Sequence, residues 1–423
     1  MNLIKELEWR GMIQDIIPGT EEQLNNEVTT GYVGFDPTAD SLHIGSLVPI
    51  ILLVHLQKSG HKPIALVGGA TGMVGDPTGK SEERNLLSAE ILLHNQEGIR
   101  RQLEKFLDFS SVETAAEMAN NADWFREMNF LDFIRDVGKY ITVNYMMAKD
   151  SVKKRLDGES GMSFTEFTYQ LIQGYDFHWL YENKGCKLQM GGSDQWGNIV
   201  TGTELIRKKS GGEAFAFTCP LIRKADGGKF GKTETGNIWL DVNKTSPYQF
   251  YQFWLNATDS DAETWIKIFT FLDRPTIEEL VSKHKEDASK RILQKRLAEE
   301  ITEWVHGAEN LKIAIDTSNK LFENQQAPAS DLSESDLQSI EGVVTSSITK
   351  EKFIKSDLTT LLVEAGIFLS KGEAKKMIAN GGVSINRNKV QDLQTKPDET
   401  MLLHKKYVLI QKGKKNYYLL NVG

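Results

Sequence analysis

The chain has 423 residues, of which 40% are hydrophobic and 26% charged, and this composition is typical of a globular protein with several domains. No apolar run reaches the roughly 18 residues of a membrane span, and the charged, amphipathic N-terminal segment lacks the core of a signal peptide. We therefore expect a cytoplasmic protein with no membrane partner. Cys186 and Cys219 are too few for a disulfide framework and lack zinc-site spacing, which predicts two buried thiols.

The net charge of −8 is unevenly distributed along the sequence. From Lys352 to Gly423 there are 13 Lys and Arg residues against 6 Asp and Glu residues, a net charge of +7, so the first 351 residues carry −15. A basic module attached to an acidic body predicts a polyanionic partner for that module.

A buried strand followed by turn residues opens the first strongly patterned stretch, 31–46. Tyr32 and Val33 end the predicted strand, and the segment 34–41 has the composition of a turn. The apolar run 42–56 then predicts a helix, which Asp40 and Ser41 would cap.

A strand that leads through a loop into a helix is a frequent anion site, because free backbone N–H groups and the helix dipole point at the ligand. His43 and Gly45 would lie in the first turn of the predicted helix. The imidazole would donate to phosphate oxygens, and the glycine would let a nucleotide approach the backbone. Taken alone, a single histidine is more often an ordinary loop or cap residue.

A second short buried strand, 64–67, is followed by a glycine-rich loop. With the first strand and helix it predicts a βαβ unit, the start of a doubly wound parallel sheet, in which ligands bind at the C-terminal ends of the strands. Gly79-Lys80-Ser81 and Gly231-Lys232-Thr233 resemble the end of a Walker A loop. We exclude that motif because only three residues, instead of four, separate Gly75 from Gly79 and Gly227 from Gly231.

Residues 88–155 are mostly helical in pattern, and 162–181 predicts a further helix. On this second helix Tyr169, Gln173 and Asp176 follow the i, i+4, i+7 spacing and share one face. The alternative is a solvated face, but apolar neighbours leave little of the helix polar. We therefore favour the wall of a pocket.

Two later segments contain candidate substrate-binding residues. In 187–198 a short strand runs into a glycine turn and a helix start, where Asp194 and Gln195 would receive ribose hydroxyls and a carboxylate or carbonyl. In the glycine-rich loop 226–237, Lys229 and Lys232 lie three residues apart, which suits a pyrophosphate leaving group.

The C-terminal part divides into three segments by pattern. Residues 247–322 predict amphipathic helices, and 321–349 contain no Lys or Arg and predict a linker. Residues 358–423 predict a small α+β module with a basic helix over 371–378 and a Gly381-Gly382 turn into a strand over 383–385. The alternative, a small solvated cap, is disfavoured by the net charge of +7.

Two of these motifs resemble one family. His43-Ile-Gly-Ser46 resembles the HIGH signature of class I aminoacyl-tRNA synthetases, with serine in place of the final histidine, and Lys229-Phe-Gly-Lys-Thr233 resembles their KMSKS loop. The residues flanking the first motif are similar to those of the tyrosine-specific members. Residues 361–386 resemble the S4 RNA-binding domain.

The resemblance implies a doubly wound Rossmann-like parallel-sheet catalytic domain over 1–222, with a helical insertion that forms a homodimer interface. A KMSKS-like loop with a helical domain facing the anticodon end (223–322), a linker (323–350) and an S4-like domain (351–423) would follow. The implied activity is attack of L-tyrosine on ATP to give tyrosyl-adenylate, then transfer of tyrosine to tRNA(Tyr), with no DNA partner. The alternatives are the tryptophan-type enzyme, a small-metabolite adenylyltransferase and a non-catalytic RNA-binding relative.

The resemblance also implies roles for individual residues. Tyr32 and a charged Asp176 would bind the substrate phenol, and Mg²⁺ would be carried by ATP, with no metal site and no permanently bound cofactor in the protein. The residues implied for catalysis are His43, Lys229, Lys232, Thr233 and Thr38; for tyrosine, Tyr32, Gly34, Asp36, Asp76, Tyr169, Gln173, Asp176 and Gln195; for ATP, His43, Gly45, Ser46, Gly192, Asp194, Lys229 and Lys232; and for further phosphate contacts, Lys80 and Arg84.

Overall fold

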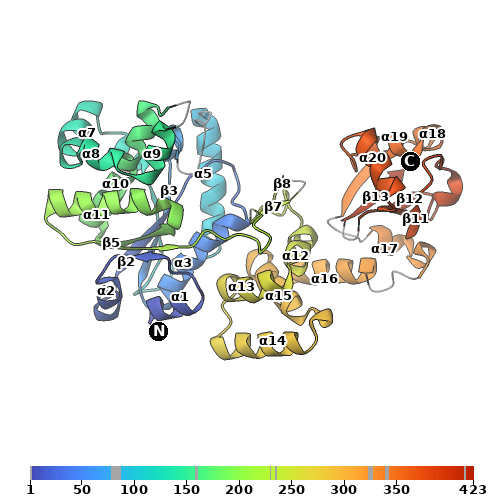
Figure 1. Ribbon diagram of the computed structural model, residues 1–423, viewed down its shortest axis with the longest axis horizontal. Helices are drawn as coiled ribbons and strands as arrows, with labels where there is room; N and C mark the ends of the chain where they lie inside the picture. Colours follow the sequence, from blue (N-terminus) through green and yellow to red (C-terminus); the bar gives the residue numbers. More distant parts are fainter. Residues whose placement is uncertain are drawn as a thin grey trace. The chain divides into compact units, whose positions relative to one another are not determined.

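The computed structural model describes residues 2–77, 87–157, 161–228, 230–233, 236–322, 327–338, 343–413 and 416–423 (Figure 1). The chain forms two compact units. The sheet unit comprises Met1–Asp241 and Thr258–Leu293, and the C-terminal unit comprises Val242–Ala257 and Gln294–Gly423. The segment 223–322, expected as one helical domain, therefore contributes to both units.

A six-stranded sheet with strand order β1-β6-β5-β2-β3-β4 forms the centre of the sheet unit. All neighbouring pairs are parallel except β1 with β6, which confirms the doubly wound fold. The chain moves outward from β2 to β3 and β4, then returns to β5 on the other side, so the topological switch point lies between β2 and β5. The strands are β1 (Asp15–Ile16), β2 (Thr30–Phe35), β3 (Lys62–Val67), β4 (Glu117–Asn120), β5 (Cys186–Gly192) and β6 (Phe215–Cys219).

Helices cover this sheet. Helices α10 (Phe164–Lys184) and α11 (Trp196–Ser210) pack on each other and against β5, whereas α3 (Leu47–Lys58) packs against β2 and β3 (Figure 1). Helix α5 (Ala89–Leu103) lies against β3. The shorter helices of the first part are α1 (Leu3–Trp9), α2 (Thr20–Asn26) and α4 (Thr71–Val74).

Helix α3 begins at Leu47, so the predicted helix start at residue 42 was wrong. Pro49 explains the difference. Within a helix that began at residue 42, its ring would clash with the preceding turn and remove a backbone hydrogen bond. In a helix that begins at Leu47, Pro49 lies in the first turn, where backbone N–H groups have no intrahelical partner. Residues 42–46 are thereby left to adopt another conformation.

The region 88–155 contains a strand as well as helices. Strand β4 interrupts it, and the insertion that follows consists of α6 (Ala122–Phe125), α7 (Phe130–Asp136), α8 (Val143–Met147) and α9 (Asp150–Leu156). Helix α10 begins with a capping box formed by Ser163 and Glu166. A buried ion pair of 2.6 Å between Arg155 and Glu166 joins α9 to this start.

Two helices from late in the sequence complete the sheet unit, α13 (Asp259–Phe269) and α14 (Arg274–Glu286). The buried Arg10, which follows α1, donates hydrogen bonds of 2.6, 2.8 and 2.8 Å to the backbone oxygens of Lys267, Thr270 and Leu272. Its guanidinium thus satisfies carbonyl groups at the C-terminal end of α13 and in the residues just beyond it.

The C-terminal unit combines helices α12 (Pro247–Leu255), α15 (Ile292–His306), α16 (Ala308–Phe322) and α17 (Glu334–Gln338) with a small α+β module. Its five-stranded sheet has the order β11-β10-β12-β13-β9. The elements of the module are β9 (Val344–Ile348), α18 (Lys350–Lys355), α19 (Leu358–Glu364), α20 (Lys371–Ala379), β10 (Val383–Ile385), β11 (Asn388–Val390), β12 (Tyr407–Lys412) and β13 (Asn416–Val422).

The basic helix and the strand over 383–385 were predicted correctly, but part of the predicted linker was not. Strand β9 lies within the segment 323–350 and pairs in parallel with β13. Its residues are exposed or half-exposed and largely polar, so the strand is held mainly by its pairing with β13. Among the residues that the structure describes, no helix is long and apolar enough to cross a membrane.

Candidate active site

A cavity of about 340 Å³ lies at the switch point of the sheet, where β2 and β5 end. This is the usual ligand position in a doubly wound sheet. The cavity brings together most of the residues singled out in the sequence, from segments that lie far apart along the chain. Its lining includes Tyr32, Gly34, Asp36, Thr38, His43, Gly45, Ser46, Asp76, Tyr169, Gln173, Asp176, Gly192 and Gln195.

Other expected residues are placed differently. Asp194 belongs to a 3₁₀ turn, Ser193–Gln195, but is not part of the cavity lining. Lys80, Arg84 and Lys229 lie outside the described residues. For Lys232 and Thr233 the backbone is described, and it forms β7 (Lys232–Thr233), which pairs with β8 (Gly236–Asn237).

The deep end of the cavity holds a tyrosine hydroxyl and a carboxyl group. The side chains of Tyr32 and Asp176 are each 1% exposed. The Tyr32 hydroxyl is buried without a hydrogen-bond partner among the described residues, as are the side-chain oxygens of Gln173 and Gln189. Buried polar atoms are rarely left unpaired. Their presence in one cavity indicates that a polar ligand completes it.

Two donors hold Asp176 in place. Its carboxyl oxygens accept hydrogen bonds from Trp124 Nε1 at 2.9 Å and Asn121 Nδ2 at 3.0 Å. Burial nevertheless raises the pKa of Asp176 to about 8, because desolvation outweighs these two bonds and Asp36 adds repulsion. Desolvation in this cavity therefore opposes the charge that was expected on Asp176.

Two further carboxylates form the polar wall of the cavity. Asp36 accepts hydrogen bonds from Thr71 Oγ1 at 2.8 Å and from the Tyr169 hydroxyl at 3.0 Å. Asp76 accepts one of 2.7 Å from Gln195 Nε2. Burial, together with these carboxylates, raises the pKa of Tyr169 well above its usual value, so its hydroxyl remains a donor. The wall presents negative charge toward the cavity, which suits an ammonium group.

His43 lies at the entrance in an extended conformation and precedes a 3₁₀ turn, Ile44–Ser46. Its Nδ1 accepts a hydrogen bond of 3.0 Å from the backbone N–H of Gly45. In the neutral ring the proton must then be on Nε2, which makes that atom a donor. A Cβ added to Gly45 would lie 2.8 Å from Cε1 of the same ring. Gly45 therefore makes room for the imidazole.

These observations correct the expected helix start in three ways. His43 and Gly45 are not in the first turn of the helix. Ser46 is the residue before α3, and its side chain makes no capping hydrogen bond. Ser41 caps nothing, since its hydroxyl donates to the Leu42 carbonyl at 2.9 Å.

Backbone hydrogen bonds join the segment around His43 to residues 238–240, which directly follow the glycine-rich loop 226–237. Ile44 N–H donates to Ile238 O at 3.0 Å, and Leu240 N–H donates to Leu42 O at 2.9 Å, so that His43 forms a β-bridge with Trp239. Gly231, with φ +80°, lies close enough to Ile44 that an added Cβ would approach it to 3.1 Å. The two motifs are thus in direct contact, which no local sequence pattern indicates.

Four residues of this site were not predicted from the sequence: Thr71, Asn121, Trp124 and Gln189. Asn121 directly follows β4, and Thr71 follows the loop after β3. For both residues, the signal in the sequence is a polar side chain that follows the end of a parallel strand. The signal for Asn121 was lost because β4 was predicted to be helical. Gln189 stands within an otherwise apolar strand.

Comparisons with known proteins agree over the entire chain. The family model described as tRNA synthetases class I (W and Y) matches residues 24–323, and the Tyrosine--tRNA ligase SYY-like C-terminal domain matches residues 336–420. Tyrosine--tRNA ligase of Bacteroides thetaiotaomicron is 60% identical, with 99% of each chain covered. Tyrosine--tRNA ligase of Flavobacterium johnsoniae is 58% identical, with 100% of this chain and 99% of that one covered.

A solved structure is also similar, that of a C-terminally truncated mitochondrial tyrosyl-tRNA synthetase of Aspergillus nidulans. It is 31% identical, with a TM-score of 0.69, and the match covers 76% of this chain and 94% of that one. Family match, sequence identity and fold all lead to one assignment: the chain belongs to the tyrosine–tRNA ligase family of class I tRNA synthetases.

Proposed function

We propose that this protein activates L-tyrosine with ATP to tyrosyl-adenylate, releasing pyrophosphate, and then transfers tyrosine to the 3′ end of tRNA(Tyr). The observation that carries the proposal is the buried pair of Tyr32 and Asp176 at the deep end of the switch-point cavity. A hydroxyl without a partner beside a carboxyl held by two donors suits a phenol, which both donates and accepts.

The tyrosine side chain would bind Tyr32 and Asp176. A cavity that hydrogen-bonds a substrate hydroxyl rejects phenylalanine, because the buried polar groups would then be left unpaired. The substrate ammonium would face the carboxylate wall. The ammonium would be bound by Asp76, Tyr169 and Gln173. The carboxylate wall would be held in place by Asp36 and Gln195, and Gly34 would leave space on β2.

ATP would enter over the His43 turn. His43 Nε2 would donate to phosphate oxygens, with Thr38, Thr233, Lys229 and Lys232 stabilising the charge that develops on the leaving pyrophosphate. Further phosphate contacts would come from Lys80 and Arg84, and the nucleoside would lie near Gly45, Ser46, Gly192 and Asp194. Mg²⁺ would arrive with ATP, as part of the substrate. Neither step needs a protein nucleophile, so alignment and charge stabilisation are the protein's contribution.

The remaining functional assignments follow the same reasoning. The C-terminal module would bind tRNA through its net charge of +7, the helices within 223–322 would face the anticodon end, and the protein would act in the cytoplasm. The domain limits 1–222, 223–322 and 351–423 remain predictions.

We also propose a homodimer formed through the helical insertion. Phe130, Ile134, Val143 and Phe164 are exposed apolar side chains around an apolar cavity of about 460 Å³. Exposed apolar patches of this kind mark protein interfaces, and a second copy would cover the surface by two-fold symmetry. Sedimentation equilibrium would measure the mass directly.

The decisive experiment is ATP–pyrophosphate exchange with each of the twenty amino acids. We expect exchange with tyrosine alone, followed by charging of tRNA(Tyr). Exchange with tryptophan would favour the tryptophan-type enzyme. Exchange with none of the twenty, by a folded protein that still binds RNA, would favour the non-catalytic relative.

A further inference from the structure

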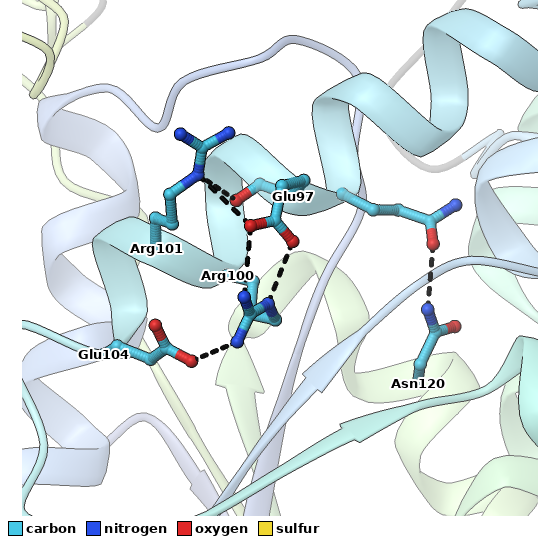
Figure 2. Close-up of polar contacts among 6 residues, drawn as sticks. Glu97, Arg100, Arg101, Glu104 and Asn120 are labelled. Atoms are coloured by element: carbon cyan, nitrogen blue, oxygen red, sulfur yellow. Dashed lines mark hydrogen bonds and ion pairs between the residues drawn. The ribbon is translucent and has the colours of Figure 1, made fainter.

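Helix α5 presents two contrasting faces. Its outer face carries charged side chains that pair with one another, Glu97 with Arg100 and Arg101, and Arg100 with Glu104 (Figure 2). Such exposed pairs contribute little stability. The inner face carries Asn95, Gly98 and Gln102 at helical spacing, and these residues contact the loop that precedes His43.

Three contacts join the inner face of α5 to this loop. Asn95 Nδ2 donates to Pro37 O at 3.0 Å. A Cβ added to Gly98 would collide with the carbonyl oxygen of Asp40. Gln102 makes two hydrogen bonds, accepting from Leu42 N–H at 2.8 Å and donating to Ser41 Oγ at 2.9 Å. The loop is therefore held by α5 along its length.

Helix α5 is itself firmly attached to the sheet. Leu92, Ile99 and Leu103 are buried, at no more than 3% exposure. Asn120 Nδ2, at the end of β4, donates to Gln96 Oε1 at 2.8 Å (Figure 2). A side chain fixed on this helix can therefore hold a loop in a defined position relative to the cavity.

Gln102 acts on the residue next to His43. Leu42 is bonded on one side by Gln102 and on the other by Leu240, and Ile44 is bonded by Ile238. These bonds fix the backbone immediately before and after His43. Gln102 is not among the residues that line the cavity.

We propose that Gln102 is a positioning residue for adenylate formation, which holds Leu42 and thereby orients His43 toward the ATP phosphates. The proposal rests on the proposed function. It goes beyond that function because it assigns a role to Gln102, which acts on His43 through the backbone of Leu42. Removing the Gln102 bonds should lower the rate of the chemical step and leave tyrosine binding intact.

The test compares three variants. Gln102→Leu removes both hydrogen bonds at similar size, and Gln102→Glu keeps an acceptor for Leu42 N–H. Arg101→Leu, one residue away on the exposed face, is the matched control, because Arg101 contacts only Glu97 among the hydrogen bonds and ion pairs of the described residues. For each protein we would measure single-turnover adenylate formation, the tyrosine dissociation constant and the melting temperature.

We expect Gln102→Leu to lower the rate constant by about 10- to 100-fold, the size of effect produced by misplacing a reacting group by up to an ångström. Tyrosine affinity should change less than about twofold. Gln102→Glu should recover most of the rate, and Arg101→Leu should match the wild type. The proposal is overturned if Gln102→Leu retains the wild-type rate, if Gln102→Glu is equally slow, or if tyrosine affinity falls with the rate. Failure of the wild type to form adenylate would instead refute the proposed function.

Discussion

Substituting Gly45 by alanine tests how the His43 ring is held. A Cβ at this position would lie 2.8 Å from His43 Cε1 and 3.0 Å from Nδ1. Ordinary contact begins near 3.4 Å, so the ring must recede by about 0.6 Å. Moving the ring also weakens the 3.0 Å hydrogen bond from Gly45 N–H to Nδ1.

A displacement of this size has a predictable kinetic cost. Misplacing a catalytic group by about 1 Å can cost about 100-fold in rate, so we expect Gly45→Ala to slow adenylate formation by about 10- to 100-fold. This corresponds to about 1.4–2.7 kcal/mol of activation free energy. Folding stability should change little, because Gly45 lies in a 3₁₀ turn and has no left-handed backbone conformation that alanine would oppose.

Rapid-quench measurement of a single turnover, at saturating tyrosine and ATP, gives the rate constant directly. The informative comparison is Gly45→Ala in a His43→Ala background. If the methyl group acts by displacing the imidazole, it should have almost no effect once the imidazole is gone. A full additional loss in the double variant would show that the methyl group obstructs ATP itself, and our account of Gly45 would be wrong.

Two further predictions concern the buried carboxyl and the C-terminal module. Burial raises the pKa of Asp176 to about 8, so its contribution to stability is complete below about pH 4 and is lost as the pH rises through about 8. Trp124→Phe removes a hydrogen-bond donor to this carboxyl. Relative to the wild type, the loss of stability measured by thermal unfolding should grow from about 1 kcal/mol at pH 6 to about 2 kcal/mol at pH 9. A loss that does not change with pH would contradict the assignment. Truncation after Gln338 removes β9 with the rest of its sheet, and should reduce tRNA charging at least about tenfold while tyrosine-dependent pyrophosphate exchange persists. Normal charging by the truncated protein would exclude the module as an RNA contact.

Periodicity was sufficient where a segment carries its own pattern. The face of α10 that bears Tyr169, Gln173 and Asp176 was predicted from spacing alone, because polar residues at helical spacing among apolar neighbours indicate the wall of a pocket. The glycine turn into β10 was likewise local. These elements form from interactions between residues close in sequence.

Most of the errors concern interactions over long sequence distances. Strand β4 has a half-buried pattern without alternation, and β9 is largely polar, so each is recognisable only by its pairing with β3 or β13. The geometry around His43 depends on Gln102 and Trp239, which no spacing rule relates to it. Pro49 was a local signal for the helix start, and the apolar run around it obscured that signal.

The discontinuity of the sheet unit has a consequence for synthesis of the chain. Helix α1 buries Leu3, Ile4 and Leu7, and the adjacent Arg10 donates three of its hydrogen bonds to the backbone oxygens of Lys267, Thr270 and Leu272. A ribosome delivers the N-terminal residues first, so the carbonyl groups that Arg10 binds are absent until some 260 further residues have emerged. During that interval Glu6, in helix α1, is the hydrogen-bond partner of Arg10 that is already present. Completion of the sheet unit is therefore a late event, timed by the arrival of α13.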